Sequence, residues 1–286
     1  MAASTAALRG ITKQYKDFTL GPVDMTVPAG SIVGLIGENG AGKTTLLKIL
    51  CGVNRADDGT VDLLGGSPAD AATRAKIGVV FEDAFFYGSF TAAQVARSLA
   101  GMYGARWNAD SFSAYLRRFG LDAGKKLKEY SRGMRLKLSL AAALAHDPEL
   151  LVLDEATAGL DPVVRGELLD LFLEFIQDER HSIVMSSHIT ADLEQIADSI
   201  AYLHNGQLLF QENKDDLLQE YGVLHCGEDV LTSLPAGLVV FTRRGAYGCE
   251  SLVRERRTVQ ELLPEAVCDG ARLDDIMRFY SGRDAQ

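Results

Sequence analysis

The chain has 286 residues and carries 39 acidic against 29 basic residues, a formal net charge of −10. An acidic balance of this size disfavours nucleic acid or a generic anionic membrane surface as a partner, so no nucleic acid is expected. With 47% hydrophobic residues, the length suits one large domain with a small appendage. No apolar stretch reaches the length of a membrane span, and the first ten residues do not resemble a signal peptide, so we expect a cytoplasmic protein.

The chain has four cysteines, none of them in a CxxC pair. We therefore expect reduced thiols rather than disulfides. A zinc site made of three cysteines and a histidine is conceivable, although the spacing matches no metal-binding motif. Its ligands would be His225, Cys226, Cys249 and Cys268, whereas Cys51 would stand alone.

The N-terminal segment, residues 8–27, alternates loosely between apolar and polar residues, as short edge strands of a sheet do. Residues 28–30 (PAG) predict a turn into an apolar run, residues 32–36, which predicts a buried strand. Tyr15 precedes this strand, and its ring could stack on an adenine base or simply pack on the sheet. The residues alone leave both interpretations open.

Residues 37–45 read GENGAGKTT and stand between that strand and a helical pattern. A strand, a glycine-rich turn and a helix with Gly37, Gly42, Lys43 and Thr44 at this spacing predict a phosphate-binding loop. Glycines let backbone N–H groups converge on an anion, and the positive end of the helix adds to the attraction. We expect Lys43 to reach the β- and γ-phosphates and the Thr44 hydroxyl to ligate Mg²⁺. The chain is therefore predicted to bind a nucleoside triphosphate.

Residues 60–64 and 77–81 have the composition of strands, and they are followed by a block with a helical pattern that has no proline over residues 91–145. We predict that this block, about residues 88–148, is a helical subdomain inserted into an α/β core. Ser131 and Gly133 lie at a predicted helix start within it. A hydroxyl and a glycine there suit the binding of an anion, but they also suit an ordinary N-cap.

Two later predicted strands end in polar side chains. Residues 149–155 (ELLVLDE) place Asp154 and Glu155 at a strand tip, and His188 directly follows the apolar run 181–187. We expect Asp154 to hold Mg²⁺ and Glu155 to orient the attacking water or accept its proton. Because open parallel sheets carry functional groups at the carboxyl ends of their strands, we expect His188 to sense the γ-phosphate.

The last part of the chain predicts a hairpin and a small appendage. Asn205-Gly206 is a two-residue turn between apolar runs, and beyond residue 211 the periodicity loosens. We predict a small α+β appendage, residues 213–286, without a catalytic constellation. Its expected strands are 238–242 and 251–254, and its expected helices are 215–221, 259–263 and 273–280.

Five motifs occur in one order, and together they resemble the ATP-binding cassette (ABC) ATPase family over roughly residues 5–212. GENGAGKTT resembles Walker A, LLVLDE resembles Walker B, SRGMR the signature, AGLD the D-loop, and Ser187-His188 the switch histidine. Tyr15 matches the adenine-stacking aromatic. The resemblance implies a P-loop NTPase (RecA-like) α/β core with an antiparallel β edge and the inserted helical subdomain. Residues 1–212 would form this nucleotide-binding domain.

The resemblance also implies a head-to-tail dimer of two cassettes, identical or different, that sandwiches two ATP molecules. Ser131 and Gly133 of one subunit would contact the γ-phosphate held by Lys43 of the other, and hydrolysis would release the dimer. The implied catalytic residues are Lys43, Glu155 and His188, and the implied Mg²⁺ residues are Thr44, Glu82 and Asp154. The implied nucleotide contacts are Tyr15, Gly37, Asn39, Gly40, Ala41, Gly42, Lys43, Thr44, Thr45, Ser131, Gly133 and Asp161.

Four positions depart from the family pattern. Glu82 stands where glutamine is usual, Arg132 and Met134 where glycine and glutamine are commonest, and Ala156 where proline is usual. Glu82 can still accept hydrogen bonds from water and bind metal, but its added charge keeps a binding-only cassette as an alternative. The catalytic residues are all present, so we expect a working ATPase.

Within the family, the segments YSRGM, LDEATAGLDPVVR, SSHITADLEQIAD and LDDIMRFY are similar to bacterial type-2 exporter ATPases of the YtrB-like and antibiotic-resistance groups. We therefore expect the ATP-hydrolysing subunit of an exporter, peripheral on the inner face of the cell membrane. It would dock on a separate transmembrane permease through the helical subdomain and the Glu82 region. The alternatives are a soluble cassette that acts on nucleic acid or ribosomes, and an importer ATPase.

Overall fold

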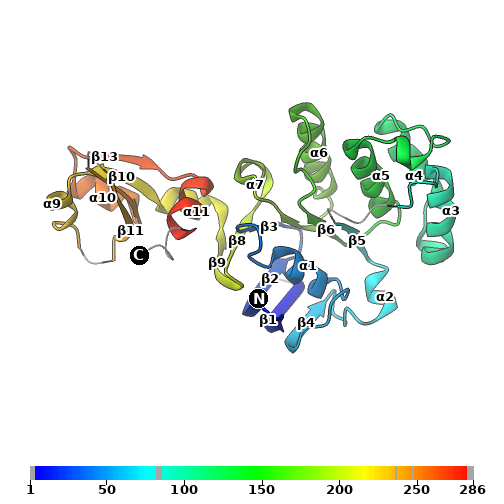
Figure 1. Cartoon of the computed structure of the whole chain (residues 1–286), viewed down its shortest axis with the longest axis horizontal. Coiled ribbons are helices and arrows are strands. Elements are labelled where there is room, and N and C mark those ends of the chain that lie inside the picture. The colour runs from blue at the N-terminus through cyan, green and yellow to red at the C-terminus, as the bar shows by residue number, and fades with distance from the viewer. Residues whose placement is uncertain (1–3, 82–85, 236, 246–247, 282–286) are drawn as a thin grey trace.

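The computed structural model describes residues 4–81, 86–235, 237–245 and 248–281, and it confirms the predicted α/β fold (Figure 1). A six-stranded sheet forms the centre. In spatial order its strands are β5 (Ile77–Val80), β6 (Leu150–Asp154), β7 (Ser182–Ser186), β3 (Ile32–Ile36), β8 (Ser199–His204) and β9 (Gln207–Asn213). The first five run parallel, and only β9 is antiparallel to its neighbour. Every residue of β3, β6 and β7 is buried, as expected for parallel strands covered on both faces.

A second, antiparallel sheet forms the edge that the sequence predicts, but its strands are longer than expected. It consists of β2 (Thr19–Pro28), β1 (Ser4–Gln14) and β4 (Asp58–Leu63). The register of β1 on β2 shifts on both sides of Ile11, and Gly10 has a positive φ of 59°. Such bulges interrupt the alternation of apolar and polar residues. In the sequence, β1 therefore has the pattern of several short strands, although it is one continuous strand.

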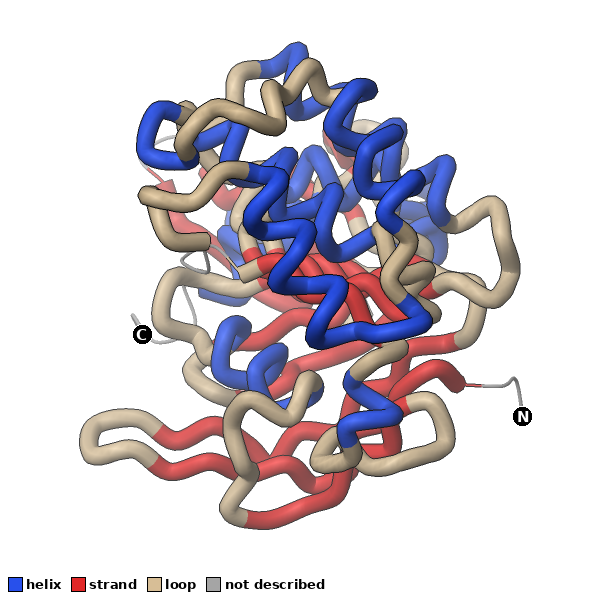
Figure 2. Tube along the Cα trace, turned by 90° about the vertical axis from the view of Figure 1, so that its right-hand side faces the viewer, coloured by secondary structure: helices blue, strands red, loops and turns tan. Residues whose placement is uncertain are grey.

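The two faces of the six-stranded sheet are covered by different layers. Val33 and Leu35 belong to an apolar core shared with α1 (Lys43–Leu50) and the antiparallel sheet. Ile32 and Ile36 belong to a core shared with α6 (Pro162–Phe175) and α7 (Thr190–Ile196). Figure 2 shows most helices on one side of the strands and the antiparallel sheet on the other. The short helix α2 spans Ala71–Arg74.

The block between β5 and β6 is helical, as predicted. Its three main helices enclose a separate apolar core with Phe112, Leu127 and Leu138 at its centre. Thr91 begins the first helix with a capping box, and Asn108 and Ser131 cap the other two through side-chain oxygens. The helices are α3 (Ala92–Tyr103), α4 (Ala109–Arg118) and α5 (Arg132–Leu144), with 3₁₀ turns at Gly104–Arg106 and Leu127–Glu129.

The C-terminal part contains a third sheet, of which the sequence predicts only two strands. The sheet is antiparallel in the order β11 (Val239–Gly245), β12 (Gly248–Val253), β10 (Gly222–Cys226) and β13 (Val267–Gly270). The two strands missed are short, and β13 (VCDG) buries only Cys268, so neither has a periodic signal. The helices here are α8 (Lys214–Glu220), α9 (Glu228–Leu231), α10 (Arg256–Leu262) and α11 (Leu273–Ser281).

Helix α11 packs this C-terminal part against the central sheet. The ring of Tyr280 makes edge contacts with Tyr202 of β8 and Phe210 of β9, at centroid distances of 5.7 and 5.6 Å. The rings bury a continuous apolar surface between the two parts, because Tyr202 and Phe279 belong to the same core.

The zinc alternative fails on geometry. His225 and Cys226 are neighbours in β10, so their side chains point to opposite faces of the sheet. Among the described residues, no group of three or more His, Cys, Asp or Glu side chains could hold a metal ion, and all four cysteines are free thiols. No helix in the described ranges has both the length and the apolar character needed to cross a bilayer.

Candidate active site

The loop of residues 37–45 joins β3 to α1 and needs its glycines. A Cβ on Gly37 would lie 2.3 Å from Leu203 O, and a Cβ on Gly42 would lie 2.9 Å from Phe18 Cζ. Gly40 and Gly42 also have left-handed φ values of 84° and 106°. Gly42 precedes α1 without a side-chain cap, so the first-turn N–H groups are left for another acceptor. The loop therefore has the shape of an anion cradle.

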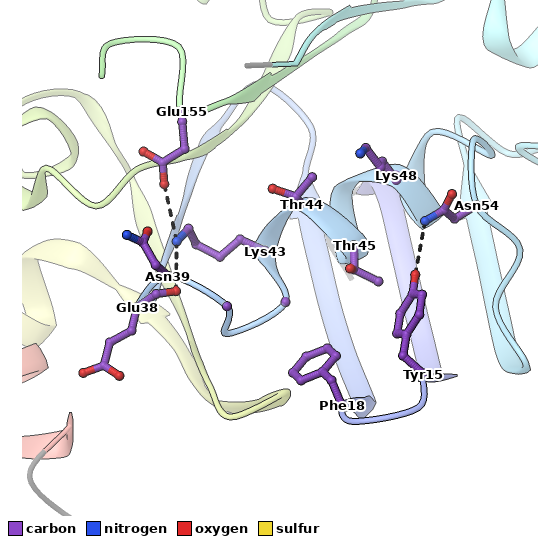
Figure 3. A pocket seen from close by; sticks show the side chains of 12 residues that line it. Tyr15, Phe18, Glu38, Asn39, Lys43, Thr44, Thr45, Lys48, Asn54 and Glu155 are labelled. Atoms are coloured by element: carbon purple, nitrogen blue, oxygen red, sulfur yellow. Dashed lines mark hydrogen bonds and ion pairs between the residues drawn. The ribbon is translucent and has the colours of Figure 1, made fainter. Parts of the chain in front are cut away.

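Lys43 folds back over this loop (Figure 3). Its side chain is 6% exposed, and Nζ donates to Gly37 O at 2.8 Å and to Glu38 O at 3.3 Å. The same Nζ lies 3.4 Å from Glu155 Oε1. A buried ammonium group held by carbonyl oxygens can exchange those acceptors for phosphate oxygens when an anion enters the loop.

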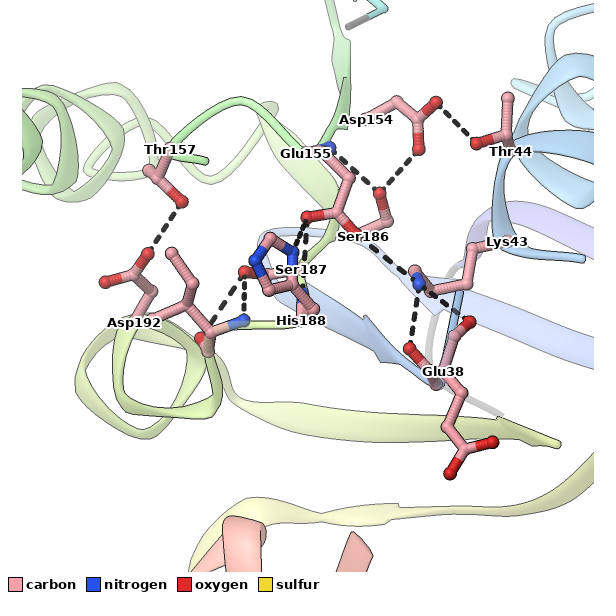
Figure 4. Close-up of polar contacts among 12 residues, drawn as sticks. Glu38, Lys43, Thr44, Asp154, Glu155, Thr157, Ser186, Ser187, His188 and Asp192 are labelled. Atoms are coloured by element: carbon pink, nitrogen blue, oxygen red, sulfur yellow. Dashed lines mark hydrogen bonds and ion pairs between the residues drawn. The ribbon is translucent and has the colours of Figure 1, made fainter. Parts of the chain in front are cut away.

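Asp154 ends β6 with both carboxylate oxygens engaged (Figure 4). Oδ2 accepts from Thr44 Oγ1 at 2.8 Å, and Oδ1 accepts from Ser186 Oγ at 2.6 Å. Asp154 is 2% exposed and is the register partner of Ser186 in β7. Ser186 is not among the residues predicted from the sequence, because only the register of β7 on β6 brings its hydroxyl to Asp154.

Where Thr44 and Asp154 converge, the two side chains offer only oxygen atoms as metal ligands. A hydroxyl and a carboxylate are the ligands that Mg²⁺ prefers, so these two residues fit that ion. Burial is the main cause that raises the pKa of the nearby Cys51 thiol to about 12, and the negative charge of Asp154 adds to it. The sulfur therefore stays protonated. Glu82, the third residue expected at the metal, lies outside the described residues.

Glu155 is held between two basic side chains. Its Oε2 accepts from His188 Nδ1 at 2.6 Å and from the His188 backbone N at 3.3 Å, while Oε1 faces Lys43. Glu155 also adopts a left-handed φ of 52°, which is strained for a non-glycine residue. Strain of this kind, in a carboxylate aimed at a lysine and a histidine, is typical of a functional site.

A pocket of about 450 Å³ opens beside the loop. Tyr15, 45% exposed, lies on its wall, and Asn54 Nδ2 donates to Tyr15 Oη at 3.4 Å. Of the two interpretations of Tyr15, this placement favours a ring open to a ligand. Among the other expected contacts, Gly37 and Ala41 belong to the loop but are buried and do not line the pocket. The residues lining the pocket are Tyr15, Phe18, Glu38, Asn39, Gly40, Gly42, Lys43, Thr44, Thr45, Lys48, Asn54 and Glu155.

Four pocket residues are not among the contacts predicted from the sequence, namely Phe18, Glu38, Lys48 and Asn54, although Glu38 lies within the predicted loop. Lys48 follows Thr44 by one helical turn, which puts both on one face of α1 and was a usable signal. Phe18 is an aromatic residue close to Tyr15 in the sequence, with ring centroids 6.4 Å apart. Nothing in the sequence distinguishes Asn54.

The comparisons with known proteins agree with this geometry. A family model described as ABC transporter matches residues 20–158. The bacitracin transport ATP-binding protein BcrA of Enterococcus faecalis is 36% identical over 212 residues, which cover 72% of this chain and 68% of that protein. The chain belongs to the ABC transporter ATP-binding family. This cassette is an ATPase, as the sequence analysis predicts.

Other relatives extend the comparison. An uncharacterized ABC transporter ATP-binding protein of Synechocystis, sll0415, is 38% identical over 206 residues, or 70% of this chain, but the cassette spans only 58% of its length. A solved ATP-binding subunit of an ABC transporter is 29% identical, with a TM-score of 0.69 over 75% of this chain and 92% of that one. The structure of cbiO1 from Clostridium perfringens, described as part of the complex cbiONQ, is 25% identical, with a TM-score of 0.62 over 75% and 90%.

Three expected nucleotide contacts of the cassette lie away from its pocket. Ser131 caps α5, with Oγ accepting from Met134 N at 3.2 Å, and Asp161 caps α6, with Oδ1 accepting from Val164 N at 3.0 Å. A Cβ on Gly133 would have Leu160 Cδ2 as its nearest neighbour, at 3.6 Å. The described residues that line the pocket include none of the three. Within one chain, the signature segment lies beside the D-loop instead.

Proposed function

We propose that the cassette is the ATP-hydrolysing subunit of an exporter and that it drives a separate transmembrane permease. The observation that carries the proposal is Glu155, held between Lys43 and His188 at the edge of the sheet where Asp154 and Thr44 converge. The direction of transport rests on likeness to relatives such as BcrA, whose name assigns it to bacitracin transport.

The proposed nucleotide site combines the loop and Tyr15. Backbone N–H groups of residues 37–45 and the Lys43 ammonium would bind the phosphates of ATP. The half-exposed Tyr15 ring would stack on the adenine base, with its hydroxyl fixed by Asn54. Thr44 and Asp154 would hold Mg²⁺, which supplies positive charge to the phosphates when it is bound. Glu82 is proposed as a further metal residue on the family pattern alone.

The proposed hydrolytic step uses residues on two adjacent strand ends. Glu155 would orient the attacking water and take its proton, because its carboxylate is aimed into the pocket and 11% exposed. His188 would turn from Glu155 to the γ-phosphate, a movement that its 52% exposure allows. Lys43 would hold the β- and γ-phosphates in place.

Replacing Tyr15 with alanine should weaken ATP binding about tenfold, because stacking of a base on an aromatic ring contributes about 1–3 kcal/mol. Tyr15→Phe keeps the ring and loses only the long Asn54 contact, so its affinity should stay within about twofold. Titration with a fluorescent ATP analogue measures both. Equal affinities for Tyr15→Ala and the wild type would mean that the ring does not bind the base.

Two cassettes, identical or different, are proposed to close head to tail around ATP. The α5 amino end, with Ser131 and Gly133, and Asp161 at the start of α6 would face the partner's nucleotide, since the described residues of their own pocket do not include them. The positive end of a helix favours an anion such as the γ-phosphate.

Ser131→Arg should prevent ATP-dependent dimerisation, because a bulky cation would replace the small cap at the contact. Size-exclusion chromatography with light scattering in ATP should show a monomer that still binds nucleotide. Ser113→Arg is the matched control, since Ser113 is an exposed helical serine of α4. A Ser131→Arg dimer as stable as the wild type would contradict the proposed interface.

The remaining proposals concern organisation. Residues 1–212, with the helical subdomain of about 88–148, would form the nucleotide-binding domain, and residues 213–286 a separate appendage. The subdomain and the Glu82 region would dock on the permease, which places the cassette on the inner face of the cell membrane. The cassette cbiO1, described as part of a complex, supports such an assembly. The net charge of −10 argues against a nucleic-acid partner.

A genetic experiment tests export. Cells that lack the cassette should become sensitive to a cell-envelope peptide antibiotic of the bacitracin class. The wild-type chain should restore resistance, and a Glu155→Gln variant should not. Unchanged antibiotic sensitivity together with poor growth on a limiting nutrient would indicate an importer instead.

A further inference from the structure

Asp192 is a buried acidic residue that the proposed hydrolytic step does not use. It lies in α7, one turn after His188, and its side chain is 1% exposed. Oδ2 accepts a 2.6 Å hydrogen bond from Thr157 Oγ1, and Oδ1 accepts from the Arg165 guanidinium. A carboxylate is costly to bury unless it is paired and hydrogen-bonded, and both oxygens of Asp192 are engaged.

The partners of Asp192 come from segments that flank the active site. Thr157 is 1% exposed and stands two residues after Glu155. Arg165 lies in the first turns of α6, and its backbone N donates to Asp161 O at 3.0 Å. Figure 4 shows the Thr157–Asp192 bond beside the Glu155–His188 contact. These two side-chain links join the same two segments beyond the ends of β6 and β7, in addition to the bonds that Glu155 N donates to Ser186.

These two links differ in environment. The link between Glu155 and His188 is partly open to water, because the histidine is 52% exposed, and it must break if His188 is to reach a γ-phosphate. The link between Thr157 and Asp192 is buried and involves a charged acceptor, and such hydrogen bonds are stronger and better fixed than exposed ones. The buried link does not depend on His188, so it can hold the segments beyond the strand ends in place while His188 moves.

We propose that Asp192, acting through Thr157 and Arg165, is a positioning residue that sets the alignment of Glu155 with His188. The inference rests on the proposed roles of these two residues in ATP hydrolysis. Arg165 stands in the first turn of α6, and its backbone N donates to the backbone O of Asp161, the D-loop residue that caps this helix. A contact that a second cassette makes with this loop would therefore also shift the pair of Glu155 and His188.

The test uses a substitution at Thr157 that removes one hydrogen bond and keeps the shape of the side chain. Thr157→Val should lower kcat for ATP about tenfold and leave KM within about twofold, because a small misplacement of catalytic groups slows the reaction without weakening binding. Thr157→Ser keeps the hydroxyl and should retain most of the turnover. Asp192→Asn changes the acceptor of the same hydrogen bond and removes the negative charge that faces Arg165. This variant should also lower kcat rather than raise KM.

The matched control is Thr5→Val. Thr5 is also a buried threonine, 5% exposed, and its hydroxyl bonds Ser182 Oγ at 2.7 Å at the opposite end of β7. The Thr5→Val variant should have lower thermal stability than the wild type and the same kcat. If Thr157→Val behaved like Thr5→Val, with lower stability and unchanged kcat, Asp192 would be merely structural and the inference would be wrong.

A spectroscopic measurement separates this inference from the proposed function. The imidazole NMR signal of His188, assigned by its loss in His188→Ala, should shift in Thr157→Val and stay in place in Thr157→Ser. Wild-type turnover in His188→Ala would overturn the proposed role of His188 itself. Loss of turnover in His188→Ala, with an unmoved His188 signal and normal kcat in Thr157→Val, would overturn only the positioning role.

Discussion

Glu155→Gln should lower ATP hydrolysis by a factor of about 10²–10⁴, the range that a general base contributes. The amide oxygen of glutamine can still accept from His188 Nδ1, which now bonds Glu155 Oε2 at 2.6 Å. An amide cannot take a proton from water, however, and it carries no charge to pair with Lys43. ATP binding should survive because Lys43 and residues 37–45 are untouched. The variant should therefore accumulate as an ATP-bound dimer.

Two measurements follow this variant, namely phosphate release with ATP and Mg²⁺ and light scattering of the same sample. Glu149→Gln is the matched control, since Glu149 precedes the same strand and pairs with Lys76 at 3.3 Å on the surface. It should hydrolyse ATP like the wild type. Full activity in Glu155→Gln would show that another group handles the water, and loss of dimerisation would show that Glu155 serves the interface.

Much of the site could be predicted because its residues stand at the ends of consecutive motifs. Residues 37–45 are contiguous, so the spacing of the glycines, the lysine and the threonine within them is enough to predict the shape of the loop. Asp154 and His188 each follow an apolar run, and parallel strands bring such ends to one sheet edge. Predictions of this kind require only the order of the segments in the sequence and the expectation that the strands are parallel.

The contacts that could not be predicted join segments whose relative placement depends on the fold. Ser186 meets Asp154 through strand register, and Asp192 meets Thr157 and Arg165 through the packing of α6 beside α7. Asn54 reaches Tyr15 only because the loop after α1 returns to the antiparallel sheet. No local pattern specifies these pairs, and the same holds for strands β10 and β13, which are too short to have a period.

Lys43→Met should weaken ATP binding about tenfold to hundredfold, since a hydrogen bond to a charged group contributes about 1.5–3 kcal/mol. Methionine fills a similar volume, so the change removes the ammonium and leaves the packing. The loss should be larger for hydrolysis than for binding, because Nζ also lies 3.4 Å from Glu155 Oε1. Without the cation, Glu155 Oε1 would lose its ion-pair partner, and the carboxylate would be held less firmly in the position needed to orient the attacking water.

Titration with an ATP analogue and phosphate release measure the two losses separately, and thermal unfolding without nucleotide checks the fold. Lys76→Ala is the control, because its ion pair with Glu149 lies on the surface and such pairs contribute little. If Lys43→Met lost binding and hydrolysis by the same factor, the lysine would act on the phosphates alone. A larger loss of hydrolysis would mean that it also keeps Glu155 aimed at the water, which ties the nucleotide loop to the catalytic carboxylate.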